Sequence, residues 1–253
     1  MVLIRSIDLM GYQPLLFSMI WLLPLLCGCI QGDTIQKTSV MSAAALSWIN
    51  HSHTGIPSES AQLLLVAGES SQPVFVQIFV LEKWMSEWTQ VFSPVEAIIG
   101  LKGFAEPGGK REGDGKTPTG IFPLEFVFGY DETVNTRMPY RQATETDIWV
   151  DDAQSDDYNK WVSRTQTRAA SFEEMKRKDN LYKYGIVIGY NRQPIIKGNG
   201  SAIFLHIRAD NNIPTSGCVA LAEEDLLRII GWLDPAKTPL ILMGYEESLR
   251  KLK

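Results

Sequence analysis

The sequence has little cysteine, little histidine and no excess of positive charge. Its 253 residues include three cysteines and three histidines, and the net charge at neutral pH is −5. An acidic chain lacks the basic surface that nucleic-acid binding requires, so no nucleic-acid partner is expected. The scarcity of histidine also argues against a zinc site built from histidine clusters. We therefore expect neither a metal ion nor a cofactor.

The sequence also lacks an apolar run long enough for a comfortable membrane span. The run Leu15–Leu26 has an apolar core of about a dozen residues, which is typical of a signal peptide, so we predict that residues 1–28 form one. Its end, Leu26-Cys27-Gly28-Cys29, resembles the lipobox of bacterial lipoproteins, in which the last cysteine takes the lipid. We expect lipidation at Cys29, the alternatives being ordinary signal cleavage or a retained anchor. All three alternatives place the rest of the chain outside the cytoplasm. We expect the periplasmic side of the cell envelope, at the outer membrane where the host has one.

Cys218 is the one cysteine outside this N-terminal segment. In an oxidising compartment, a cysteine without a partner cannot form an intramolecular disulfide. The general alternative is a buried, inert thiol. A histidine close by in the sequence favours a chemical role for Cys218 instead.

The stretch Gly200–Leu221 contains both His206 and Cys218. A predicted strand at Ala202–Leu205 leads into the histidine, and another at Val219–Leu221 follows the cysteine, with turn-forming residues between them. A thiol and an imidazole at strand ends are typical of a nucleophile and its base. The backbone N–H groups of Ser216, Gly217 and Cys218 are candidates for an oxyanion hole. These residues predict a cysteine acyl-transfer enzyme.

The remaining pattern predicts a mainly β, sandwich-like domain with a few peripheral helices. Closely spaced apolar strands without strong helices between them favour an antiparallel sandwich. A capping box predicts a helix from Ser171 to about Lys178, and a second helix follows Leu221 and ends at Pro235. We predict a tether at 29–60 with one short helix, a catalytic domain at 61–246 and a C-terminal tail at 247–253.

From Gln62 to Gly244 the chain resembles the L,D-transpeptidase catalytic domain of the YkuD type. Two motifs carry the resemblance. The loop KREGDGKTPTGIF at 110–122 is similar to the Gly-Asp-Gly-x-Thr-Pro-x-Gly-x-Phe loop of the family, and His206 is followed by TSGCV at 215–219. The second motif departs from the commoner form, because Ser216 replaces a histidine and Ala220 replaces an arginine. The resemblance is therefore to a divergent branch.

The resemblance implies that Cys218 is the nucleophile and that His206 activates it, with the backbone of residues 216–218 as the oxyanion hole. Arg208 is the candidate replacement cation for a peptide carboxylate, the alternative being a solvated surface arginine. Further candidates for substrate binding are Gly113, Asp114, Tyr158 and Thr215.

The implied activity is cross-linking or remodelling of peptidoglycan stem peptides through a thioester on Cys218. One alternative is hydrolysis at the same site, which would make the protein an L,D-carboxypeptidase or an amidase. The other is a non-catalytic lipoprotein that binds peptidoglycan and carries an inert Cys218. The expected partners are peptidoglycan stem peptides and, through the lipid, a membrane.

Overall fold

The computed structural model describes residues 47–51 and 55–251, and this part of the chain is mainly β, as predicted. The predicted signal peptide and Cys29 lie outside the described residues. The strands are β1 (Gln62–Gly68), β2 (Phe75–Trp84), β3 (Glu87–Gln90), β4 (Val95–Ile98), β5 (Gly120–Gly129), β6 (Tyr140–Gln142), β7 (Asp147–Val150), β8 (Trp161–Ser163), β9 (Phe172–Glu174), β10 (Tyr184–Ile188), β11 (Phe204–Ile207), β12 (Val219–Leu221) and β13 (Leu240–Tyr245). The helices are α2 (Glu223–Trp232) and α3 (Glu246–Leu249), with 3-10 turns at Arg164–Gln166 and Pro235–Lys237.

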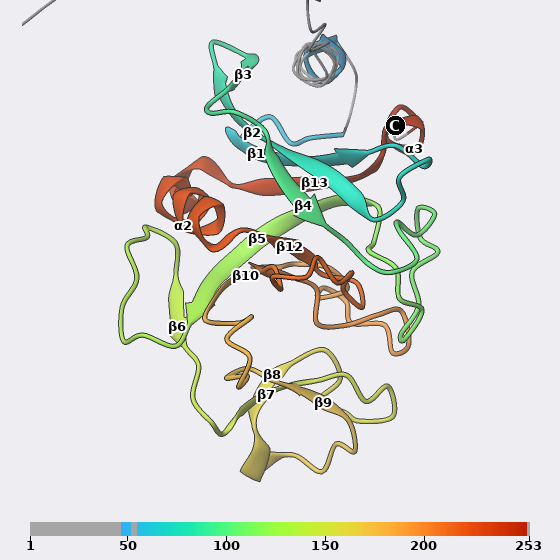
Figure 1. Ribbon diagram of the computed structural model, residues 1–253, viewed down its shortest axis with the longest axis vertical. Coiled ribbons are helices and arrows are strands. Elements are labelled where there is room, and N and C mark those ends of the chain that lie inside the picture. The colour runs from blue at the N-terminus through green and yellow to red at the C-terminus, as the bar shows by residue number, and fades with distance from the viewer. Residues whose placement is uncertain (1–46, 52–54, 252–253) are drawn as a thin grey trace, which may run out of the picture. The chain divides into compact units, whose positions relative to one another are not determined.

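The main sheet closes on itself (Figure 1). Its strands follow the order β1-β13-β5-β10-β11-β12-β4-β2, and β2 pairs back onto β1. Most neighbours are antiparallel, as predicted, but β1 pairs with β13 and β11 pairs with β12 in parallel. A closed sheet leaves no free edge on these strands, so the two layers of the predicted sandwich are continuous.

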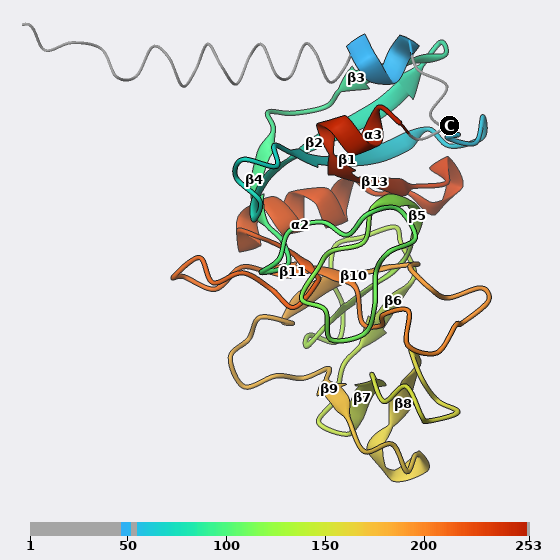
Figure 2. The same cartoon turned by 90° about the vertical axis from the view of Figure 1, so that its right-hand side faces the viewer.

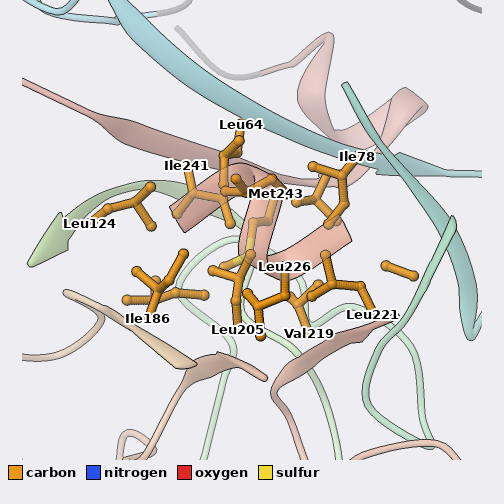
Figure 3. Packing of buried hydrophobic residues seen from close by; sticks show 14 of the residues in the cluster. Leu64, Ile78, Leu124, Ile186, Leu205, Val219, Leu221, Leu226, Ile241 and Met243 are labelled. Atoms are coloured by element: carbon orange, nitrogen blue, oxygen red, sulfur yellow. The ribbon is translucent and has the colours of Figure 1, made fainter. Parts of the chain in front are cut away.

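The interior of the closed sheet holds the main hydrophobic core (Figure 3). Alternate residues of nearly every strand point into it, because side chains on a strand point to opposite faces in turn. Helix α2 adds Leu226, Ile229 and Ile230 to this core, and Leu205 on β11 and Val219 on β12 lie against them. These residues are fully buried. The strands that carry the candidate active site are therefore anchored from behind.

A small sheet of β8, β7 and β9 lies away from β1 and β13 in both views (Figures 1 and 2). An aromatic cluster joins it to the main sheet, with Trp149 and Trp161 on one side and Phe128 and Phe204 on the other. Phe204 lies at the start of β11. The small sheet thus covers the outer face of the strands that carry the candidate site.

The prediction of a helix from Ser171 to Lys178 is wrong. Phe172–Glu174 forms strand β9, which pairs antiparallel with β7. The capping box is a local signal, and the ladder to β7 together with the burial of Met175 in the aromatic cluster outweighs it. The region Tyr130–Trp161 contains the short strands β6 and β7 and the start of β8.

Both ends of the described domain extend beyond the predicted boundaries. Residues 47–51, in the predicted tether, are helical, and Ile49 packs on the outer face of β1 and β2. Asn50 exchanges two hydrogen bonds with the backbone of Trp88. At the other end, Leu249 of α3 packs into the same cluster, inside the predicted tail. Among the described helices none has the length and apolar character to cross a membrane.

Candidate active site

The parallel pairing of β11 and β12 brings His206 and Cys218 to one face of the sheet. In this register Leu205 lies opposite Val219 and His206 lies opposite Ala220. The same register, extended back by one residue on each strand, brings Phe204 opposite Cys218. Since side chains alternate, Leu205 and Val219 point into the main core. His206 and Cys218 therefore share the opposite face and lie diagonally across from each other.

The thiol of Cys218 is buried and hydrogen-bonded. Its residue is 7% exposed, and the Sγ–H donates to the carbonyl of Ala202 at 3.2 Å. The backbone N–H of Phe204 donates to Sγ at 3.4 Å. The first contact favours a protonated thiol, whereas the second also stabilises a thiolate.

His206 is oriented by a main-chain carbonyl. Its Nδ1 lies 2.8 Å from the carbonyl oxygen of Ile207. A carbonyl oxygen only accepts, so Nδ1 carries the hydrogen and Nε2 of the neutral ring is left as an acceptor. The ring also packs edge-on against Tyr182, with centroids 5.2 Å apart. The imidazole is thus held in the tautomer that a general base requires.

Burial keeps both groups uncharged in the resting site. It lowers the pKa of His206 to about 4 and raises the pKa of Cys218 to about 12, because removal from water disfavours each charged form. At neutral pH the pair is therefore a neutral imidazole and a neutral thiol. A preformed thiolate–imidazolium pair does not fit these directions.

The loop of residues 215–218, here called the nucleophile loop, is closed by Thr215. Its hydroxyl donates to the carbonyl of Cys218 at 2.7 Å and accepts the N–H of Gly217 at 3.1 Å. Of the three predicted oxyanion donors, Gly217 is therefore already engaged. The N–H groups of Ser216 and Cys218 make no hydrogen bond to any other described residue and remain the candidate oxyanion donors.

The signature loop, residues 110–122, supports the nucleophile loop from behind. Asp114 is its hub, because its carboxylate accepts from the ammonium of Lys110 at 2.6 Å and from the backbone N–H groups of Arg111 and Lys116 at 2.8 Å each. These interactions lower the pKa of Asp114 against the opposing effect of burial. A Cβ on residue 217 would lie only 2.9 Å from the carbonyl oxygen of Lys116. Position 217 therefore requires glycine.

Residues 81–242 match the model of the YkuD family, described as the L,D-transpeptidase catalytic domain. The chain belongs to this family. The match covers both motifs and most of the main sheet. No curated protein and no solved structure matches the chain at a significant level.

Membership makes the protein an L,D-transpeptidase-type peptidoglycan enzyme at the level of the family, with peptidoglycan as its class of substrate. The fold and the two motifs agree with it, since the closed β domain presents both motifs at one place. Ser216 and Ala220, where the sequence departs from the commoner motif, lie in the nucleophile loop and on β12. Ala220 is buried beside His206 and offers no charge to a substrate.

His206 and Cys218 of this transpeptidase domain line a cleft of about 980 Å³. Gly113, Arg208 and Thr215 line it together with His206 and the nucleophile loop, as expected of substrate-binding candidates. Asp114 and Tyr158 do not line it. Tyr158 is 1% exposed, and its hydroxyl donates to Glu112 at 2.5 Å and accepts from the N–H of Gly200 at 3.0 Å. Both residues therefore support the cleft wall.

Three cations line the cleft, and they differ in their partners. Lys110 pairs with Asp114, and Arg177 pairs with Glu173 and Asp179. Arg208 makes no ion pair with any of the residues described. It is therefore the cation whose charge is free to meet a substrate.

Sequence reasoning missed several residues that shape the cleft. Glu112 accepts hydrogen bonds from both Tyr158 and Ser201, so it clamps the signature loop to the segment before β11. Its place directly before the Gly-Asp-Gly motif was a usable signal. Arg177 reaches the cleft from beyond β9, and nothing local in the sequence marks it. Within residues 47–51 and 55–251 no cluster of histidine, cysteine and acidic residues could hold a metal.

The burial of His206 predicts a dependence of stability on pH. Since the folded pKa is about 4 and the ordinary value is 6.5, the unfolded chain binds the extra proton first as the pH falls. Relative to a His206→Gln variant, the wild type should lose about 3 kcal/mol of unfolding free energy between about pH 6.5 and 4. Urea unfolding of both proteins across this range measures it. A constant difference between them would contradict the burial argument.

Proposed function

We propose that the protein is a cysteine acyltransferase that acts on peptidoglycan stem peptides through a thioester on Cys218. The observation that carries the proposal is the shared face of β11 and β12, which directs the thiol and the imidazole into one cleft. A buried thiol with no role needs neither an oriented imidazole nor free N–H donors beside it. His206 and the nucleophile loop supply both.

In the proposed first step, the thiol of Cys218 gives its proton to Nε2 of His206 while Sγ attacks a peptide carbonyl. The carbon–sulfur bond forms, and the carbonyl electron pair moves onto oxygen, where the N–H groups of Ser216 and Cys218 can donate to it. The oxyanion then collapses, the C–N bond breaks, and the leaving amine takes the proton from His206. The product is a thioester and a free amino acid.

In the second step an acceptor amine attacks the thioester and loses a proton to His206. The carbon–sulfur bond breaks, and the returning proton restores the thiol of Cys218. Water in place of the amine would give hydrolysis by the same route. Since both groups are neutral at rest, proton transfer accompanies the attack rather than preceding it.

We further propose that Arg208 binds the terminal carboxylate of the stem peptide. The family's stem substrates end in a D-residue whose free carboxylate lies one residue beyond the attacked carbonyl. Arg208 directly follows β11, its backbone N–H donates to Leu221 on β12 at 2.7 Å, and its side chain lines the cleft without a carboxylate partner. Guanidinium binds carboxylate through two parallel hydrogen bonds, which also fixes the orientation of the peptide.

We also propose that the enzyme works at the periplasmic side of the cell envelope, held by a lipid on Cys29. The support is the apolar run before Cys29 and the glycine directly before it, together with a substrate class that lies outside the cytoplasm.

Acylation should depend on Cys218. After incubation of residues 30–253 with a tetrapeptide muropeptide, intact mass should show a thioester adduct or a cross-linked product, and Cys218→Ala should show neither. The product mass distinguishes transfer from hydrolysis. A folded Cys218→Ala protein that still turns over the muropeptide would refute the assignment, and a folded wild type without adduct or product would favour the binding-only alternative.

Removal of the free cation should weaken substrate binding. Arg208→Gln should raise KM roughly tenfold with little change in kcat, because a hydrogen-bonded charge pair contributes about 1.5–3 kcal/mol. Arg168→Gln, which removes an exposed arginine outside the cleft, is the matched control. Steady-state kinetics with a stem peptide and its C-terminal amide measure it. The wild type should lose affinity for the amide, whereas Arg208→Gln should bind both equally; an equal loss in both proteins would exclude Arg208.

The lipid anchor predicts where the protein fractionates. The wild type expressed in a bacterial host should sediment with membranes, and Cys29→Ser should appear in the soluble fraction. Mass spectrometry of the mature N-terminal peptide should find the lipid on Cys29. An unmodified Cys29 in membrane-bound protein would instead favour a retained anchor.

A further inference from the structure

Lys110 is a buried cation in the wall of the cleft. Its side chain is 4% exposed, and its ammonium donates to Asp114 at 2.6 Å and to the carbonyl of Arg111 at 2.7 Å. Lysine is almost never buried without a partner, and desolvation offsets much of what a buried ion pair contributes to stability. The ion pair with Asp114 alone therefore does not account for the burial of this ammonium. The surroundings of Lys110 indicate a further role.

The stem of Lys110 lies near two glycines, Gly200 and Gly217. A Cβ on Gly200 would come within 3.0 Å of its Cγ and 3.2 Å of its Cε. A Cβ on Gly217 would lie 3.7 Å from the same Cε. Gly200 precedes Ala202, whose carbonyl accepts the Cys218 thiol, and Gly217 is the residue directly before Cys218. The end of the lysine side chain therefore lies against both segments that position the thiol.

The nucleophile loop supplies no charge of its own. Thr215, Ser216 and Gly217 are uncharged, and Ala220 follows on the same face as Cys218. An ammonium has three N–H donors, and the two hydrogen bonds to Asp114 and Arg111 leave one of those of Lys110. Lys110 thus brings a positive charge close to the nucleophile loop, and one of its N–H donors is left over.

We propose that Lys110 is a positioning residue that places positive charge beside Cys218 and so favours the thiolate and the negatively charged stages of acyl transfer. The inference rests on the proposed function, because it assigns a second group to the same site. A positive charge near a thiol favours its ionised form, and this effect is strong where water is excluded. Asp114 moderates that charge and holds the lysine in place.

Charges around the thiol act in both directions. The charged and titratable groups that face it are Lys110, Glu173 on β9, Arg177 beyond β9, Tyr182 before β10 and His206 on β11. Burial is the largest influence and raises the pKa of Cys218, and Glu173 raises it further. Lys110 and Arg177 lower it. Arg177 pairs with two carboxylates, whereas Lys110 pairs with one carboxylate.

The test is the alkylation rate of Cys218 by iodoacetamide in the full chain, followed on the peptide that contains Cys218 between pH 7 and 10. Lys110→Met keeps an apolar side chain of similar length and removes the charge. It should slow alkylation about 3- to 10-fold at each pH, because the pKa of Cys218 rises by up to about one unit. Lys110→Arg should restore most of the rate. Lys102→Met, which removes an exposed lysine near the signature loop, should match the wild type.

A second variant separates charge from scaffolding. Asp114→Asn leaves the lysine and removes its countercharge, so it should speed alkylation where Lys110→Met slows it. Thermal unfolding of each variant reports whether the loop is intact. Slower alkylation in both variants, or no change in Lys110→Met, would overturn the proposal. The readout needs no substrate, so a protein that shows these shifts yet leaves muropeptides untouched would contradict the proposed function and keep the inference.

Discussion

Parallel pairing between β11 and β12 places Leu205 and Val219 in the core and His206 and Cys218 in the cleft. A slip of one residue would exchange the two faces, with a histidine entering the apolar interior and a leucine entering the cleft. Burial of a leucine side chain contributes roughly 1.5–3 kcal/mol, and the core side of this pair holds several such residues. The hydrophobic effect acting on one face thus holds His206 and Cys218 on the other, and α2 behind the strands completes that support.

The same burial that orders the site also opposes its chemistry. The thiol and the imidazole are both kept neutral, because neither ion is well solvated there. The fixed dipoles of the site work against that effect: the Phe204 N–H already points to sulfur, and the nucleophile loop offers further N–H groups. Such preorganised donors stabilise charge where it develops without first reorganising solvent. Several small, fixed interactions thus offset a large desolvation penalty. This explains why several segments of the chain meet around Cys218.

The sequence predicted the mainly β fold and singled out His206 and Cys218, which the structure places on one face. Apolar runs bounded by turn formers mark strands, and a single cysteine after the N-terminal apolar segment is conspicuous. The prediction failed where the decisive contact is remote. The capping box at Ser171 predicted a helix, yet β7 supplies a ladder for the same residues. Tyr158 was proposed for substrate binding, yet it lies behind the wall, hydrogen-bonded to Glu112. Neither the orienting carbonyl of Ile207 nor the cleft position of Arg177 has a local signature, because the tertiary fold creates both.

Closure of the main sheet also has a consequence for the order of folding. The last ring strand, β13, pairs with the first, β1, joining Leu63 to Leu240 from opposite ends of the domain. A chain that emerges N-terminus first therefore exposes one edge of β1 until nearly all of the domain is available. Contacts so distant in sequence are closed slowly, because the entropy of the intervening loop is lost before they form. Cys218 lies only shortly before β13 in the sequence, so both the cleft and the ring of strands depend on the last part of the domain to become available.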